Sequence, residues 1–213
     1  MTATFRRHTS NRSQTLFLLF AGLFSVGTLP LSAIAVDINF NDGTNGAFVG
    51  NFYAGLGVTF SANTQWDNFV SPDEGLVGAG GLKISDVTAA NYQPKITNPL
   101  VATFSTPISS FQIRGLNVGS NGARIDAYDA AVGGALIDFD EAFGVSAGTS
   151  NHPLLVTSGT PIWRVHMYQP QSVEIEGLLF DNMSFLPVPE PTTLLLLATA
   201  LALTLGSARK RRG

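Results

Sequence analysis

Hydrophobic and polar positions follow three patterns along this chain of 213 residues. The apolar runs 16–26 and 194–205, one near each end, are long and almost unbroken. Between them, short runs of Val, Ile, Phe and Thr alternate with Gly, Asn, Ser and Pro at intervals of roughly 8–12 residues. Nothing between residues 36 and 186 has the period of about 3.6 residues that marks an amphipathic helix. The pattern predicts an all-β, antiparallel β-sandwich between two terminal apolar helices.

Ten short segments carry the strand pattern. Because successive side chains of a strand point to opposite faces, alternation also predicts their orientation. It places Phe111 and Ile113 toward the core in one strand, and Trp163, Val165 and Met167 toward it in a later strand. The expected strands are Val36–Phe40, Gly57–Ser61, Gly81–Ile84, Leu100–Phe104, Ser110–Val118, Ala123–Asp129, Ala135–Phe139, Pro153–Val156, Ile162–Tyr168 and Leu178–Phe185.

The first 35 residues have the three parts of a secretory signal peptide. Arg6, Arg7 and Arg12 precede the first apolar run. Ala33 and Ala35 then supply small side chains at the spacing that signal peptidase recognises. We expect cleavage after Ala35. An uncleaved N-terminal anchor fits less well, because the apolar run is short.

The end of the chain predicts a single transmembrane helix. Residues 192–208 contain no charged side chain, and about 17 helical residues span roughly 25 Å, close to the thickness of a hydrocarbon core. The cations Arg209, Lys210, Arg211 and Arg212 follow directly. Since such a basic cluster resists translocation, we expect the C-terminus in the cytoplasm and the mature chain before it outside.

A proline-containing motif precedes this helix. It has the sequence Val188-Pro189-Glu190-Pro191, and its two prolines hold the segment extended and outside the helix. The motif, the helix and the basic end together resemble the PEP-CTERM sorting signal of Gram-negative bacteria. The resemblance implies recognition and removal of the tail by a membrane-embedded exosortase, with export to the cell surface or the exopolysaccharide matrix. The alternative is a single-pass anchor that is never cut.

These boundaries divide the chain into a signal peptide, 1–35, an ectodomain, 36–186, and a sorting signal, 187–213. The ectodomain has the size of one domain. It holds five of the 12 Lys and Arg residues and 14 of the 15 Asp and Glu residues, so its net charge is near −9. An acidic surface of this kind argues against nucleic-acid binding. The chain has no cysteine, so the exported domain depends on its core, its sheets or a metal instead of disulfides.

Several motifs of the ectodomain occur in an order similar to that of β-sandwich ectodomains that are frequent on PEP-CTERM proteins. Those ectodomains in turn resemble jelly-roll carbohydrate-binding modules. The resemblance implies the fold more than any activity. One departure is that the first motif often carries two acids where this chain has Asn41-Asp42. The motifs occupy residues 39–43, 53–61, 104–111, 125–129 and 180–185.

The resemblance further implies a structural calcium site, since jelly rolls often join their first and last strands with one Ca²⁺. Oxygen donors occur at both chain ends: Asp37, Asn39 and Asp42 near the start, and Asp181 with Asn182 near the end. Ca²⁺ takes about six to eight oxygen ligands. The site requires neighbouring end strands. The alternative is an ordinary polar turn, and no other cofactor is expected.

Two groups of aromatic residues are candidates for sugar binding. Trp66 is expected in a loop between polar neighbours, and Tyr168 shares the outward side of its strand with Arg164 and His166. Aromatic rings stack on the apolar faces of sugars while amides and carboxylates bind the hydroxyls. Core packing is the alternative for each single aromatic residue, and aromatic side chains are more often buried than exposed for binding.

Paired carboxylates are the candidates for catalysis. Asp138 and Asp140 share one strand face, and Glu174 and Glu176 do likewise; glycosidases use two carboxyl groups across a cleft. Alternating acids also keep a solvent-facing strand soluble, which is the better explanation. Without a cysteine or a Gly-x-Ser-x-Gly motif, a hydrolytic triad has little support.

The sequence therefore predicts a non-catalytic exported protein that an exosortase sorts and processes and that binds exopolysaccharide. Two alternatives stay open. One is a secreted glycan-active hydrolase that uses strand carboxylates, and the other is a purely structural, membrane-tethered surface protein.

Overall fold

The computed structural model describes residues 33–67, 81–84, 95–144, 150–173 and 177–189. All of them belong to one compact unit, Ala33–Pro189. The two expected terminal helices lie outside the described residues, and so do Glu174 and Glu176. Within the described ranges, no helix is long and apolar enough to cross a membrane.

The predicted all-β, antiparallel fold is confirmed. Every pairing between the strands of the described residues is antiparallel. They hydrogen-bond in the order β3-β4-β9-β5-β8-β6-β7, with β1 beside β9 and β2 beside β5. The elements are β1 (Val36–Ile38), the 3₁₀ helix η1 (Ala54–Leu56), β2 (Val58–Phe60), β3 (Thr64–Asp67), β4 (Gly81–Ile84), β5 (Leu100–Val118), β6 (Ala123–Tyr128), β7 (Leu136–Ala142), β8 (Ser150–Tyr168) and β9 (Leu179–Pro187).

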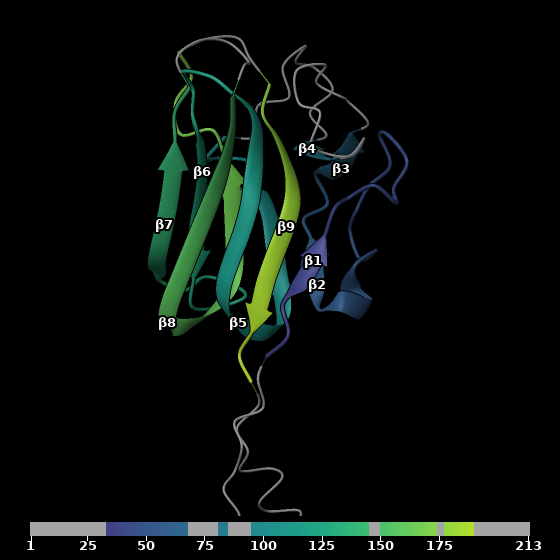
Figure 1. The fold of residues 1–213 in the computed structure, drawn as a ribbon, viewed down its shortest axis with the longest axis vertical. Helices are drawn as coiled ribbons and strands as arrows, with labels where there is room; N and C mark the ends of the chain where they lie inside the picture. Colours follow the sequence, from purple (N-terminus) through teal and green to yellow (C-terminus); the bar gives the residue numbers. More distant parts are fainter. Residues whose placement is uncertain (1–32, 68–80, 85–94, 145–149, 174–176, 190–213) are drawn as a thin grey trace, which may run out of the picture. The chain divides into compact units, whose positions relative to one another are not determined.

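The long strands β5 and β8 join the two layers of the sandwich (Figure 1). Their pairing is interrupted between Thr103 and Ile108 of β5. Before the interruption, β5 pairs with β2 and with the end of β8, which continues to β6 and β7. After it, β5 pairs with β9 and with the start of β8. Four segments expected as separate strands are therefore two strands that bend from one layer into the other.

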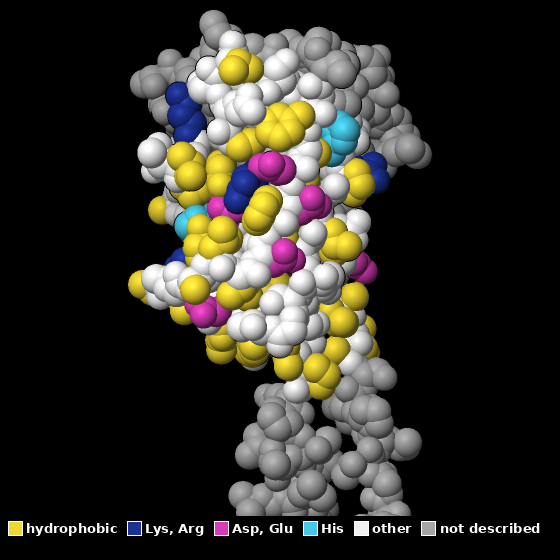
Figure 2. All heavy atoms as spheres, turned by 90° about the vertical axis from the view of Figure 1, so that its left-hand side faces the viewer, with side chains coloured by type: hydrophobic (Ala, Val, Ile, Leu, Met, Phe, Trp, Pro, Cys, Tyr) yellow, Lys and Arg dark blue, Asp and Glu magenta, His cyan; other side chains and the backbone are white. Residues whose placement is uncertain are grey.

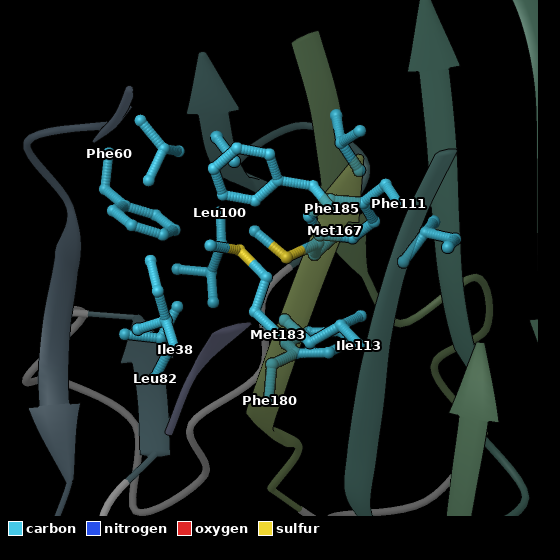
Figure 3. Packing of buried hydrophobic residues seen from close by; sticks show 14 of the residues in the cluster. Ile38, Phe60, Leu82, Leu100, Phe111, Ile113, Met167, Phe180, Met183 and Phe185 are labelled. Atoms are coloured by element: carbon cyan, nitrogen blue, oxygen red, sulfur yellow. The ribbon is translucent and has the colours of Figure 1, made fainter. Parts of the chain in front are cut away.

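The core lies between these layers and is made of aliphatic and aromatic side chains (Figure 3). The predicted inward positions Phe111, Ile113, Val165 and Met167 are all fully buried. Trp163 is only half-buried, which corrects its predicted inward orientation. It lies where the pairing of β8 with β5 is irregular, and strict alternation is lost there.

The first and last strands are neighbours, which is the arrangement that a shared metal site requires. β1 pairs with β9 through Val36 with Phe185, Asp37 with Ser184, and Ile38 with Met183. Because Ile38 and Met183 are buried, the residues that alternate with them point to the opposite side.

Candidate functional site

A polar and aromatic surface covers the outer side of β6, β7 and the second half of β8. Ile125, Ala127 and Val165 are fully buried, so the residues that alternate with them point outward. The pairing register places these outward residues beside one another across three strands. Figure 2 shows this side of the molecule, where hydrophobic side chains lie among acidic and basic ones. We name the surface the Phe139 face and define it by Arg124, Asp126, Tyr128, Phe139, Glu141, Arg164 and His166.

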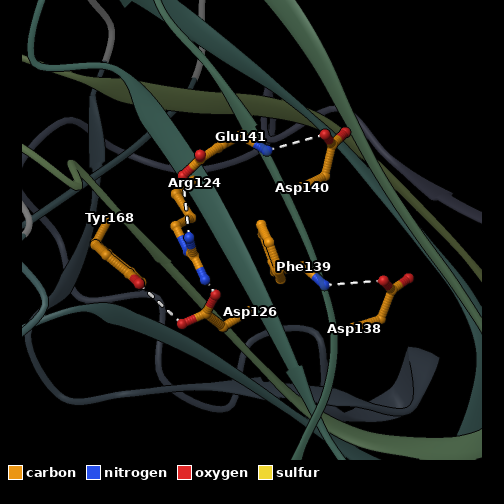
Figure 4. A network of polar contacts seen from close by, with 7 residues as sticks. All are labelled: Arg124, Asp126, Asp138, Phe139, Asp140, Glu141 and Tyr168. Carbon is orange, nitrogen blue, oxygen red and sulfur yellow. Dashed lines mark hydrogen bonds and ion pairs between the residues drawn. The ribbon is translucent and has the colours of Figure 1, made fainter.

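Arg124 is at the centre of this face (Figure 4). Its Nε donates to Oδ1 of Asp126 at 2.8 Å, and its Nη1 donates to Oε2 of Glu141 at 3.0 Å. The guanidinium carbon lies 4.0 Å from the centre of the Phe139 ring. Two ion pairs and one cation–π contact therefore fix the orientation of a side chain that is otherwise highly flexible.

Phe139 is the exposed aromatic residue of this face. Its side chain is 50% exposed, although it lies beside the Arg124 guanidinium. Its partner across the ladder is Asp126, and Glu141 is two positions further along the same strand. An exposed ring among fixed hydrogen-bonding groups is the combination that sugar-binding surfaces use.

A second stack lies on the same face. The rings of Tyr128 and His166 have centroids 4.6 Å apart, and the Arg164 guanidinium lies 4.5 Å from the centre of the Tyr128 ring. Arg164 also donates to the backbone carbonyl of Ala131 at 3.1 Å and to that of Gly133. Burial, together with the charge of Arg164, lowers the pKa of His166, which favours the neutral imidazole.

Tyr168, predicted to bind a ligand, lies opposite Arg124 in the ladder and is buried at the margin of this face. Only 3% of Tyr168 is exposed, and its hydroxyl donates to Oδ2 of Asp126 at 2.8 Å. Burial and this hydrogen bond raise the pKa of Tyr168 to about 12. Both oxygens of the buried Asp126 carboxylate are thereby paired, one with Tyr168 and one with Arg124.

Trp66 lies in strand β3, not in the expected loop. Its side chain is 4% exposed and packs edge-on against Phe52, with ring centroids 5.0 Å apart. Gly43 covers the indole so closely that a Cβ added at Gly43 would lie 2.1 Å from ring atoms. This packing leaves no ring face for a sugar and agrees with the core alternative.

The candidate calcium ligands Asp37, Asn39 and Asp42 all line one pocket, together with Asn182. We name it the β1–β9 pocket; its volume is about 330 Å³. The Tyr53 hydroxyl donates to Oδ1 of Asp42, and burial raises the pKa of Tyr53 far above its usual range. The complete lining is Asp37, Ile38, Asn39, Asp42, Tyr53, Leu56, Asn182, Met183 and Ser184.

Asp181, the fourth candidate ligand, is fully buried and is not among the lining residues. Its Oδ1 accepts the backbone N–H of Asn182 at 2.6 Å, and its Oδ2 has no hydrogen-bond partner. Burial raises the pKa of this carboxyl to about 7. In the part of the chain that the structure describes, no group of three or more acidic or histidine side chains is placed to hold a metal. The calcium site stays a prediction.

Asp138 and Asp140, the carboxylates considered for catalysis, connect the edges of the two layers. Asp138 accepts the backbone N–H groups of Phe139 and Thr157, each at 2.9 Å. Asp140 accepts those of Glu141 at 2.9 Å and Leu155 at 2.8 Å. Leu155 and Thr157 belong to β8, so the two carboxylates accept backbone N–H groups along the edge of that strand. Both oxygens of each group are thus engaged in structural hydrogen bonds, which argues against a role in acid–base catalysis.

The fold resembles carbohydrate-binding modules at low sequence identity. A family 6 carbohydrate-binding module has 10% identity and a TM-score of 0.38, over 72% of this chain and 94% of that chain. A module from Clostridium stercorarium, solved with cellobiose, has 10% identity and a TM-score of 0.36, over 71% of this chain and 92% of that chain. Discoidin II of Dictyostelium discoideum has 12% identity and a TM-score of 0.37, over 67% of this chain and 60% of that chain.

The sequence comparisons give one match, at the end of the chain. No curated protein matches the chain. The family model of the PEP-CTERM protein-sorting motif matches residues 187–212, which include the Pro-Glu-Pro sequence, the uncharged run and the basic residues that follow it. The chain therefore carries a PEP-CTERM sorting motif, as its sequence predicted.

Proposed function

We propose that the protein is exported as a membrane-anchored precursor and processed at residues 189–191 by an exosortase. The product then belongs to the surface or the extracellular matrix of a Gram-negative bacterium. The matched sorting motif supports this route. The test is the intact mass of the protein recovered from the native host. A species that begins at Val36 and ends between Pro189 and Pro191 is expected, and a species that retains residues 194–213 contradicts processing.

On the surface, the protein acts as a non-catalytic binder of polysaccharide through the Phe139 face. The observation that carries this proposal is the half-exposed Phe139 ring, held beside Arg124. A sugar ring stacks on Phe139, and its hydroxyl groups bond to the neighbouring Arg124 and Glu141. Since the Arg124 guanidinium is already fixed by Asp126 and Glu141, its ordering costs little when the ligand binds.

The test of this face is retention on polysaccharide. Phe139→Ala removes the stacking surface, so retention of the protein on immobilised exopolysaccharide from the native host should fall at least tenfold. Phe48→Ala is the matched control, because Phe48 is 60% exposed and lies outside the Phe139 face. Equal retention of both variants and the unaltered protein contradicts the proposed site. Absence of retention in all three favours a purely structural surface protein.

The alternative of a glycan-active hydrolase is weakened for Asp138 and Asp140, whereas Glu174 and Glu176 lie outside the described residues. Backbone N–H groups occupy both oxygens of Asp138 and of Asp140. A catalytic carboxyl group must instead be within hydrogen-bond reach of the substrate.

A further inference from the structure

The β1–β9 pocket has unpartnered polar side chains on one side. Asp37 of β1 and Ser184 of β9 are opposite one another in the ladder, so their side chains are close neighbours on the same face. Neither side chain has a hydrogen bond or ion pair within the described part of the chain, and the same holds for the Asn182 side chain. All three line the pocket, so their hydrogen-bonding capacity is available to a ligand.

The opposite wall supplies a second carboxylate. Asp42 uses its Oδ1 to accept the Tyr53 hydroxyl, and Tyr53 is itself 4% exposed and packed against Phe40. The buried tyrosine thereby anchors the Asp42 carboxylate at the pocket, where its second oxygen has no bond within the described residues. Leu56, 49% exposed, adds an apolar surface beside it.

The charge of the lining is negative. Asp37 and Asp42 are acidic, and none of the residues that line the pocket is Lys, Arg or His. The surrounding ectodomain is acidic as well, with a net charge near −9 over residues 36–186. Such a pocket favours a cationic ligand over a neutral one. An ammonium group, which has three donors and no acceptor, complements two carboxylates.

The size of the pocket favours an organic cation over a bare metal ion. Ca²⁺ draws its oxygen ligands to about 2.3–2.6 Å, whereas a volume of about 330 Å³ belongs to the lower range of small-molecule pockets, about 300–1,000 Å³. The amides of Asn39 and Asn182 and the hydroxyl of Ser184 complement hydroxyl groups, and Leu56 complements the apolar face of a ring.

We propose that the β1–β9 pocket binds a protonated amino sugar, with Asp37 and Asp42 accepting hydrogen bonds from its ammonium group. This inference deepens the proposed function, because it names the class of sugar, but it uses a site separate from the Phe139 face. Binding at the two sites is therefore tested in separate experiments, and a negative result at one site does not decide the other.

The test is calorimetric titration of the full chain, in detergent and EDTA, below neutral pH. Glucosamine, N-acetylglucosamine and glucose are compared, because only glucosamine carries a charged amine. Glucosamine should bind at least tenfold more tightly than the two neutral sugars. Asp37→Asn and Asp42→Asn should each weaken glucosamine binding about tenfold or more. Asp129→Asn is the control for the loss of one negative charge, since Asp129 uses its Oδ1 for the backbone N–H of Ala135, an acceptor that Asn retains.

A second variant tests the sign of the electrostatic argument. Asn182→Asp adds a carboxylate to the pocket, so glucosamine binding should tighten. Equal binding of glucosamine and N-acetylglucosamine overturns the proposal. It is also overturned if glucosamine fails to bind while Ca²⁺, titrated without EDTA, binds in a manner that Asp37→Asn abolishes, which assigns the pocket to the metal. Retention on exopolysaccharide through Phe139 is measured independently. If that retention is absent, the glucosamine titration still tests the pocket.

Discussion

Replacing Asp181 by Asn should change how the stability of the domain depends on pH. In the folded protein the Asp181 carboxyl is fully buried, and its Oδ2 has no hydrogen-bond partner. Burial raises its pKa from 3.8 to about 7, against the opposing effects of the Asn182 N–H and the Arg114 charge. The folded state therefore retains a proton that the unfolded state releases near pH 4.

The sign and size of the effect follow from this difference. Since the folded pKa is the higher one, this group stabilises the protein most below pH 4, and that stability is lost as the pH rises toward 7. A shift of about three units corresponds to roughly 4 kcal/mol. Between pH 5 and pH 8 the loss is about 2–3 kcal/mol, or roughly 5–10 °C in melting temperature for a domain of this size. Asp181→Asn removes this dependence and keeps an acceptor for the Asn182 N–H.

The assay is thermal unfolding of the full chain in detergent and EDTA at a series of pH values, followed by the fluorescence of Trp66 and Trp163. The melting temperature of Asp181→Asn relative to the unaltered protein should rise steadily from pH 5 to pH 8. Asp129→Asn removes a charge elsewhere and should show no such trend. Parallel curves for the unaltered protein and Asp181→Asn would refute the reasoning. If Ca²⁺ added without EDTA abolishes the trend, Asp181 ligates the metal as the sequence predicted.

Two further substitutions test the packing described above. Gly43→Ala should lower the melting temperature, because its Cβ would lie 2.1 Å from the Trp66 ring and such overpacking costs about 1–3 kcal/mol; an unchanged melting temperature contradicts the close contact. Asp140→Ala leaves the exposed N–H groups of Leu155 and Glu141 without their acceptor, which should cost about 0.5–1.5 kcal/mol because water can replace it. By exposing an edge of β8, the change should also promote self-association in size-exclusion chromatography. Asp140→Asn retains one acceptor oxygen and should show a smaller effect.

The alternation of the sequence was sufficient for the fold class but not for the continuity of strands. The segments 105–109 and 158–161 contain Ser, Thr, Gly and Pro, which are typical of turns, so β5 and β8 were each expected as two strands. The structure instead bends both strands through these segments. Strand β3 was missed because Thr64–Asp67 is short and has one large apolar residue. Its place in the sheet comes from pairing with β4, a contact distant in sequence.

The candidate sites also depend on strand pairings that a local sequence pattern does not contain. The resemblance to jelly rolls grouped Asp37, Asn39 and Asp42 with Asp181 and Asn182. The pairing of β1 with β9 brings Asn182 to the same pocket as the first three, but Asp181 does not line it. Phe139 was not identified as a site residue, because alternation with the acids Asp138 and Asp140 indicates an inward ring, whereas the structure exposes it and leaves the two acids less exposed. What makes it a candidate is Arg124, which reaches it only because β6 pairs with β7. The register between β6 and β7 cannot be inferred from the local sequence pattern of either strand.

The position of the sorting motif is consistent with removal of the tail after folding. β9 ends at Pro187, and its pairings with β1, β4 and β5 involve residues up to and including Pro187. Val188 makes one more backbone bond, donating to the carbonyl of Pro107 at 2.9 Å, and Pro189 is exposed. A cut between Pro189 and Pro191 therefore removes no strand and no core residue. A cut a few residues earlier would remove part of β9, which lies between β1 and β5. The chain has no cysteine, so no disulfide would hold the cut strand in place. Processing within residues 189–191, as proposed above, would therefore remove the tail and leave the last strand of the domain in place.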